Sequence, residues 1–190
     1  MRRGMIAFDL DGVLVDLMSV LDSILWDDYK ALRVLSNTEF SIKTKPEVSD
    51  KDIWKCIVKA YQRHETTPVY YGAASALQDV YTATGKPVLI VTARHSWVAT
   101  ETFLLVERFC PVPFHIAFAP DEQKILHLHD YEYFIEDRRR NAISIARRGK
   151  TVFLIDRPYN RGGDMHRQVL RVKDLNDAVS RWAMVMGHAT

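Results

Sequence analysis

Cysteine is scarce in this sequence, and no charge of one sign is in surplus. Cys56 and Cys110 are the only cysteines among 190 residues, too few and too far apart for a disulfide scaffold or a zinc site. We therefore expect two reduced thiols in packing positions, as in a cytoplasmic protein. The 26 basic and 24 acidic residues leave a net charge of +2. This balance predicts no stable nucleic-acid binding and no attraction to membranes.

Long apolar runs are also missing. The chain begins with Met1-Arg2-Arg3-Gly4, but Asp9 and Asp11 interrupt the apolar residues that follow. A signal peptide needs about 7–15 unbroken apolar residues and a membrane span about 20, so neither is predicted. Apolar residues make up 47% of the chain and charged residues 26%, which is typical of a globular domain with its own core.

Several short apolar runs have the length of β-strands. They lie at residues 5–8, 88–91, 115–118, 133–135 and 151–155. Their apolar residues are continuous rather than alternating, which indicates strands buried on both faces. Helical patterns follow at residues 73–84, 96–109, 139–148 and 175–186. This alternation predicts an α/β fold, a doubly wound parallel sheet with a Rossmann-like core.

Residues 17–71 break the alternation. They contain two predicted helices, about 19–35 and 50–63, joined by a polar, loop-like segment at 36–49. We interpret residues 17–71 as a small helical cap inserted after the first strand, and residues 1–16 and 72–190 as the catalytic core.

Acidic side chains follow three of the predicted strands. Asp9 and Asp11 come after the first, Glu136 and Asp137 after the fourth, and Asp156 after the last. Ligands of open α/β sheets bind at the carboxyl ends of the strands, and clustered carboxylates repel one another unless a cation lies among them. Oxygen ligands suit Mg²⁺. The alternative is that each acid merely begins a polar surface loop.

The spacing of Asp9 and Asp11 favours a division of labour. Residues two apart project to the same side of an extended chain, and Gly12 allows a tight turn behind them. One carboxylate can attack phosphorus while the other serves the leaving group as acid and base.

These positions together resemble the motifs of the haloacid dehalogenase superfamily. Asp9-Leu10-Asp11-Gly12-Val13 is similar to its first motif, Thr92 to its second, Lys124 to its third and Glu136-Asp137 to its fourth. Within the superfamily the chain resembles the 5'(3')-deoxyribonucleotidases and related small nucleotidases. The segments that carry this second resemblance are 13–16, 71–73 and 154–160. Leu17 departs from it, where some deoxyribonucleotidases have an aromatic residue, and so does Glu136, which replaces the commoner Asp.

The resemblance implies a role for each motif residue. Asp9 would form an aspartyl-phosphate, and Asp11 would protonate the leaving alcohol and then activate water. Mg²⁺ would be held by Asp9, the backbone carbonyl of Asp11 and Asp137, with Glu136 near a metal-bound water. Thr92 and Lys124 would bind the phosphoryl oxygens; taken alone, Lys124 could equally be a solvated lysine.

The substrate contacts are less specific. Arg94 and Arg138 directly follow catalytic positions and are predicted to contact the substrate; ordinary salt bridges are the alternative. Trp26 and Trp54 are the predicted base contacts of the cap, although aromatic residues at helical spacing are usually core. The further candidates are Tyr29, Phe40 and Tyr61. His127 and His129 are expected at the surface, and the arginines at 138–140 and 147–148 are expected to mark one solvated helix.

The sequence thus predicts a Mg²⁺-dependent phosphomonoesterase that acts on nucleoside monophosphates, with deoxyribonucleotides as the expected class. The alternatives are a sugar phosphate phosphatase, a polynucleotide 3'-phosphatase, or a nucleotide-binding relative without catalysis. The expected partner is a small phosphate ester, and the sequence leaves a homodimer open.

Overall fold

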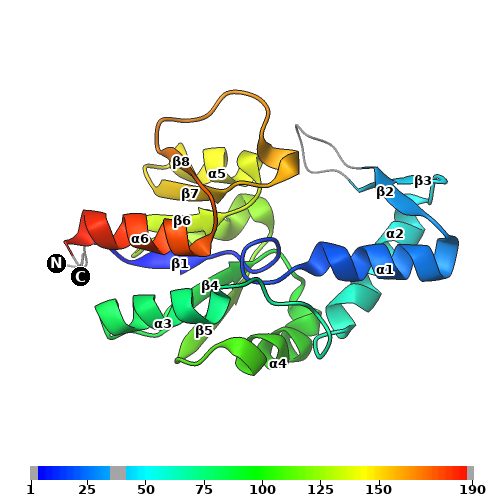
Figure 1. The fold of residues 1–190 in the computed structure, drawn as a ribbon, viewed down its shortest axis with the longest axis horizontal. Helices are drawn as coiled ribbons and strands as arrows, with labels where there is room; N and C mark the ends of the chain where they lie inside the picture. The colour runs from blue at the N-terminus through cyan, green and yellow to red at the C-terminus, as the bar shows by residue number, and fades with distance from the viewer. Residues whose placement is uncertain (1–3, 35–41, 188–190) are drawn as a thin grey trace.

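A six-stranded parallel sheet forms the centre of the molecule (Figure 1). The computed structural model describes residues 4–34 and 42–187. The strand order is β5-β4-β1-β6-β7-β8, with β1 in the interior of the sheet. The bounds are β1 Ile6–Phe8, β4 Val88–Thr92, β5 Phe114–Phe118, β6 Tyr133–Glu136, β7 Thr151–Ile155 and β8 Val169–Val172. The α/β class and the parallel sheet predicted from the apolar runs are confirmed.

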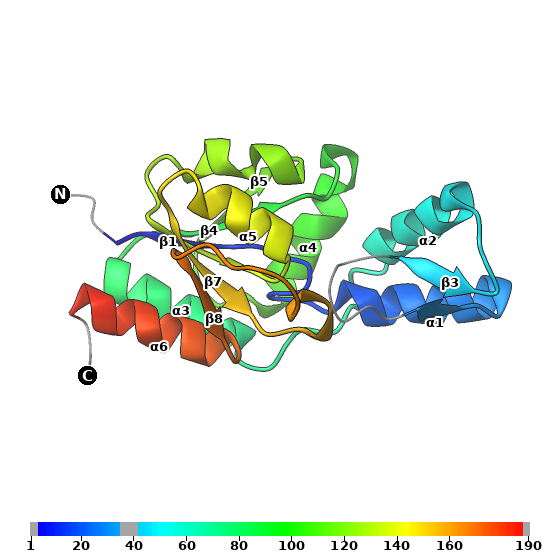
Figure 2. The ribbon, with the colours of Figure 1, turned by 90° about the horizontal axis from the view of Figure 1, so that it is seen from above.

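Helices cover both faces of this sheet (Figures 1 and 2). Helices α3 (Ala73–Thr84), α4 (Ala99–Phe109) and α6 (Leu175–Met186) pack on one face, and α5 (Arg139–Ala146) and the 3-10 helix η2 (Asp121–Leu128) on the other. Successive residues of β1 serve the two layers in turn. Ile6 and Phe8 belong to the first core cluster and Ala7 to the second, because side chains alternate across a strand. The doubly wound arrangement is therefore confirmed.

Besides the 3-10 turn η3 (Pro158–Asn160), two core elements were not predicted from the sequence. Strand β8 is short, and Leu170 within it is 40% exposed, so an edge strand left only a weak apolar signal. The second element is η2, where a polar loop was expected. The predicted helix at 96–109 begins with a separate 3-10 turn, η1 (Ser96–Val98), and the one at 139–148 ends at Ala146.

The cap differs from the helical prediction. Helix α1 (Leu17–Tyr29) ends six residues before the predicted 35, because Lys30 takes a left-handed conformation with φ of 52°. The chain then enters strand β2 (Leu32–Val34), which pairs with β3 (Lys43–Lys45) in an antiparallel ribbon. The expectations of helix up to residue 35 and of a loop across 36–49 are therefore wrong where β2 and β3 lie. Residues 35–41, including Phe40, lie outside the described residues.

Helix α2 (Asp50–Gln62) packs along α1 at one end of the molecule (Figure 2). The Ser49 side chain accepts a hydrogen bond from the Asp52 backbone N–H and so begins α2, as a helix-capping residue does. Buried side chains of both helices, among them Leu21, Leu25 and Cys56, form a cluster separate from those of the sheet. The division of the chain at residues 17 and 71 remains a prediction.

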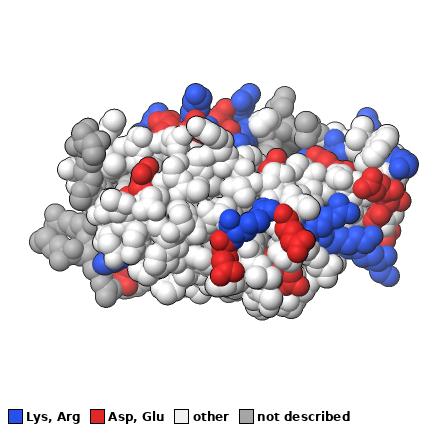
Figure 3. All heavy atoms as spheres, turned by 60° about the horizontal axis from the view of Figure 1, so that its bottom comes forward, with Lys and Arg blue, Asp and Glu red and all other residues white. Residues whose placement is uncertain are grey.

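The surface drawn in Figure 3 has no field of one sign. Basic and acidic side chains lie side by side toward the cap, and much of the remaining surface is uncharged. In the cap, Lys59 pairs with Asp28 at 2.5 Å and Lys55 with Asp52 at 2.7 Å. Within the described residues, no helix is both long and apolar enough to cross a membrane.

Candidate active site

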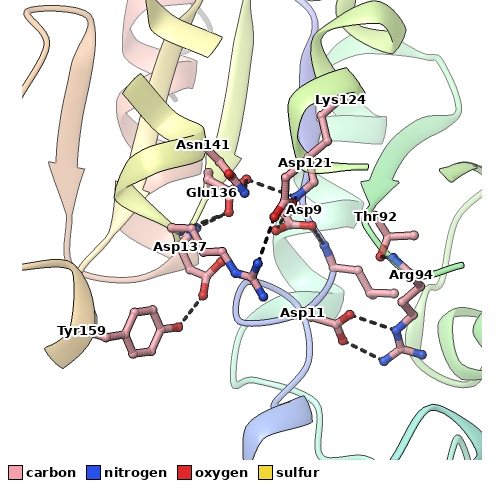
Figure 4. Close-up of polar contacts among 12 residues, drawn as sticks. Asp9, Asp11, Thr92, Arg94, Asp121, Lys124, Glu136, Asp137, Asn141 and Tyr159 are labelled. Carbon is pink, nitrogen blue, oxygen red and sulfur yellow. Dashed lines mark hydrogen bonds and ion pairs between the residues drawn. The ribbon is translucent and has the colours of Figure 1, made fainter. Parts of the chain in front are cut away.

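The carboxyl ends of three neighbouring strands bring the predicted motif residues together (Figure 4). Asp9 follows β1, Thr92 ends β4, and Glu136 and Asp137 lie at the end of β6. Because β1 pairs with both β4 and β6, these side chains meet at one edge of the sheet. The Asp9 backbone N–H also donates to the Ile135 carbonyl at 2.9 Å, which fixes the position of Asp9 relative to Glu136 and Asp137.

Asp9, Glu136 and Asp137 form a buried acidic group. Each offers a carboxylate oxygen, and these oxygens lie within 4.8 Å of one another. One oxygen of Asp137, Oδ1, is buried and has no hydrogen-bond partner among the described residues. An unpartnered carboxylate oxygen beside other carboxylates is suited to a hard divalent cation with oxygen ligands. The residues present therefore fit Mg²⁺.

Burial and mutual repulsion shift the acidities of this group. Burial, together with the charges of Glu136 and Asp137, raises the pKa of Asp9 well above its usual range. Burial and the Glu136 charge likewise raise the pKa of Asp137 to about 7. Burial also opposes the ionisation of Glu136, but Lys124 and local hydrogen bonds lower its pKa to about 2. When all three acids are ionised, they carry more negative charge than one lysine neutralises.

Lys124 is that lysine, and its side chain is only 1% exposed. Its Nζ lies 2.9 Å from Asp9 Oδ2 and 3.2 Å from Glu136 Oε2. Although burial disfavours its charge, these two carboxylates raise the pKa of Lys124 above its usual range. The alternative of a solvated lysine is wrong, because η2 carries the side chain inward.

Glu136 is held more tightly than the other acids. Its Oε1 accepts the backbone N–H groups of Asp137 and Arg138 at 3.1 Å. Its Oε2 accepts Lys124 and, at 3.4 Å, the Asn141 side chain. With both oxygens occupied, Glu136 is placed to orient Lys124.

Asp11 points away from the acidic group and pairs with Arg94. The Arg94 guanidinium donates to both Asp11 oxygens, at 2.9 and 2.7 Å. Arg94 is buried, its Nη1 has no partner among the described residues, and its guanidinium lies 4.9 Å from the centre of the Tyr61 ring. The salt bridge offered as the alternative for Arg94 thus exists. The Nη1 group of Arg94, which this salt bridge does not use, is buried and available to a substrate.

The tight turn after Asp9 packs against Asp137, the acid that follows β6. Gly12 has φ of 87°, and a Cβ at this position would lie 2.1 Å from Asp137 Oδ2. Only glycine combines this left-handed backbone with so close an approach. Arg157 donates to the Gly12 carbonyl at 2.8 and 3.2 Å and stacks on Tyr70.

Tyr159 and Asn160 were not singled out from the sequence. The Tyr159 hydroxyl donates to Asp137 Oδ2, and the fully buried Asn160 donates to the carbonyls of Asp137 and Ile155. The signals that could have drawn attention to Tyr159 and Asn160 were their place after a strand and their segment, 154–160, which carries the resemblance to the nucleotidases. Asp156, also expected at this edge, instead pairs with Arg161 and Arg171.

A cavity of about 60 Å³ lies over Asp9. We call it the Asp9 cavity. From the core it is lined by Asp9, Asp11, Ala93, Arg94, Asp121, Lys124 and Arg138, and from the cap by Leu17, Met18, Ile42, Ile57 and Tyr61. Arg138 pairs with Asp121 at 2.9 Å on its wall. Thr92 is fully buried just beneath, with its hydroxyl accepting the Arg94 backbone N–H at 3.2 Å.

The two predicted tryptophans do not line the Asp9 cavity. Trp26 is 49% exposed with Lys30 over its ring, and Trp54 is 42% exposed with its ring edge against His95. Among the described residues of the cap, Tyr61 is the aromatic side chain that lines this cavity. His127 and His129 are exposed, as expected.

Solved structures show which class of fold this is. CbbY from Rhodobacter sphaeroides in complex with phosphate is similar with a TM-score of 0.60 at 14% identity, over 90% of this chain and 94% of that chain. A haloacid dehalogenase-like family hydrolase from Xanthomonas campestris gives 0.54 at 15% identity, over 97% and 95%. The chain has the haloacid dehalogenase fold.

Among individual proteins, the chain is similar to the protein named "Putative nucleotidase BH1399" from Halalkalibacterium halodurans. The two are 26% identical over 168 residues, which cover 84% of this chain and 83% of that protein. No protein-family model matches the chain.

Proposed function

We propose that this protein is a Mg²⁺-dependent phosphomonoesterase in which Asp9 is the nucleophile. The observation that carries the proposal is the setting of Asp9, a buried carboxylate at a strand end, 2.9 Å from the Lys124 ammonium and beside Asp137. Such a setting combines a nucleophile with positive charge for phosphoryl oxygens, which is what phosphoryl transfer mainly requires.

The reaction has two balanced steps. In the first, an Asp9 oxygen bonds to phosphorus, the ester P–O bond breaks, and the leaving oxygen takes a proton from Asp11. In the second, water gives a proton to Asp11 and its oxygen bonds to phosphorus, so that the Asp9–phosphorus bond breaks and phosphate leaves.

The surrounding residues hold these groups in place. Bound by Asp9, Asp137 and the Asp11 backbone carbonyl, Mg²⁺ would supply charge that favours ionised carboxylates and withdraws electrons from the phosphoryl oxygens. Lys124 and Thr92 bind those oxygens. Arg94 holds the Asp11 carboxylate through two hydrogen bonds.

A nucleotide is the proposed substrate. Tyr61 and four apolar cap residues line the Asp9 cavity, and an aromatic ring offers a stacking surface to any base. The similarity to a protein named as a nucleotidase supports the same class.

Phosphate release from a panel of esters tests this function. Nucleoside 5'- and 3'-monophosphates, sugar phosphates and p-nitrophenyl phosphate are compared with Mg²⁺ and with a chelator. We expect the highest kcat/KM on a nucleotide and no release with the chelator or in Asp9→Asn. A sugar phosphate preferred over every nucleotide would refute the substrate class, and metal-independent release would refute the metal site.

A further inference from the structure

A second and larger cavity lies along α5. It has a volume of about 850 Å³, and we call it the α5 cavity. Asp121 and Arg138 line both this cavity and the Asp9 cavity, so the two adjoin at the Asp121–Arg138 ion pair. A ligand with one end at Asp9 would have to pass this pair to reach the α5 cavity.

The α5 cavity is strongly basic. Its charged lining consists of five arginines and one aspartate, namely Arg138, Arg139, Arg140, Arg147, Arg148 and Asp121. Among the described residues, no carboxylate pairs with Arg139, Arg140, Arg147 or Arg148. The whole chain has a net charge of only +2, so this cavity holds a local excess. Several basic side chains elsewhere pair with acids, as Lys59 does with Asp28.

Helix stability does not explain this excess. Arg147 and Arg148 follow the last turn of α5, where the helix dipole favours cations. Arg139 and Arg140, however, lie in the first turn, where the dipole disfavours them. The first turn of α5 therefore carries positive charge against the preference of the helix. An anionic ligand in the adjoining cavity would compensate for it.

The sizes of the two cavities point the same way. A pocket for a small ligand usually has roughly 300–1,000 Å³. The Asp9 cavity, at about 60 Å³, is too small for a whole nucleotide, whereas the α5 cavity falls within that range. A substrate group other than the reacting phosphate and the base thus has room beside the arginines.

We propose that the substrate carries a second phosphate, which the arginines of the α5 cavity bind while the first reacts at Asp9. This inference rests on the proposed function and narrows its substrate class to a small nucleotide bearing phosphates at two positions. Planar guanidinium groups suit a dianionic phosphate, because each can donate two parallel hydrogen bonds.

A nucleoside 3',5'-bisphosphate tests the proposal against the matching 3'- and 5'-monophosphates. We expect the wild type to have a kcat/KM at least tenfold higher on the bisphosphate. In the double variant Arg140→Gln/Arg147→Gln, this advantage should fall by about 10- to 100-fold, the loss typical of removing charge-assisted hydrogen bonds. Each rate is divided by that on p-nitrophenyl phosphate in the same variant, which removes any general damage to the enzyme.

Arg167→Gln is the matched control. Arg167 is exposed and lies outside the cavity lining, so its variant should keep the bisphosphate advantage. An unchanged advantage in the double variant, or none in the wild type, overturns the proposal. A 3'-phosphorylated oligonucleotide preferred over the bisphosphate also overturns it, in favour of a nucleic-acid end.

A binding measurement tests this inference independently of the proposed catalytic function. Calorimetric titration of the Asp9→Asn protein with the bisphosphate needs no turnover. Tighter binding of bisphosphate than of monophosphate, lost in Arg140→Gln/Arg147→Gln, supports the α5 site even if no ester is hydrolysed. Equal binding of the two ligands contradicts it even if the protein proves to be a phosphatase.

Discussion

The acidic group should make the metal-free protein less stable as pH rises. Burial and Glu136 raise the pKa of Asp137 from the ordinary 3.8 to about 7. A carboxyl group with a raised folded-state pKa stabilises the fold below its unfolded pKa, and that stability is lost as pH rises toward the folded value. The difference corresponds to roughly 4 kcal/mol in all, of which about 2–3 kcal/mol is lost between pH 5 and pH 8. Glu136, with its pKa lowered from 4.5 to about 2, is ionised in the folded state across this window and mostly ionised in the unfolded state, so it adds little slope.

Thermal unfolding with a chelator measures the effect. For a chain of this length, about 2–3 kcal/mol corresponds to a Tm lower by roughly 4–12 °C at pH 8 than at pH 5. Other groups titrate as well, so the comparison is with Asp137→Asn, which should show a much smaller decrease. Adding Mg²⁺ should raise the Tm of the wild type at pH 8 far more than at pH 5, because the cation binds ionised carboxylates. Equal pH dependence in the wild type and Asp137→Asn would refute the reasoning.

Three further substitutions test separate parts of the site. Gly12→Ala should raise the Mg²⁺ requirement or lower activity by about 10- to 100-fold in a metal titration, because its Cβ would collide with Asp137; wild-type metal dependence would contradict this. Lys124→Gln should lower the free energy of unfolding by about 3–5 kcal/mol in chemical denaturation, because it leaves buried acids unpaired; a loss under 1 kcal/mol would be evidence against that pairing. Tyr61→Ala should lose about 5- to 150-fold in kcat/KM on a nucleotide relative to p-nitrophenyl phosphate, with Trp54→Ala as the unaffected control; equal losses on both esters would remove the stacking role.

The sheet could be predicted because its strands are buried on both faces. Residues 151–155 form an unbroken apolar run, and the structure has a strand there with the same bounds. Strand β8 lies at the edge of the sheet and mixes exposed and buried positions, so its run was too short to recognise. The end of α1 was also missed, because Lys30 adopts a left-handed backbone without the glycine that usually marks it.

The core of the site could be predicted for a topological reason. Residues that directly follow parallel strands meet at one edge, whatever lies between them in the chain. No comparable rule predicts which cap residues contact the active site. Trp54 and Tyr61 are seven residues apart and share a face of α2, so periodicity alone could not separate them. Only the packing of α2 shows that Tyr61, near the end of the helix, lies over Arg94.

Trapping the phosphorylated enzyme tests the central claim most directly. A substrate labelled in its reacting phosphate is mixed with enzyme and Mg²⁺, quenched in acid within one turnover, and the protein is digested and mapped by mass spectrometry. The proposed mechanism predicts an acyl-phosphate on Asp9, absent from Asp9→Asn. Label on another residue, or turnover at the wild-type rate by Asp9→Asn, would contradict it.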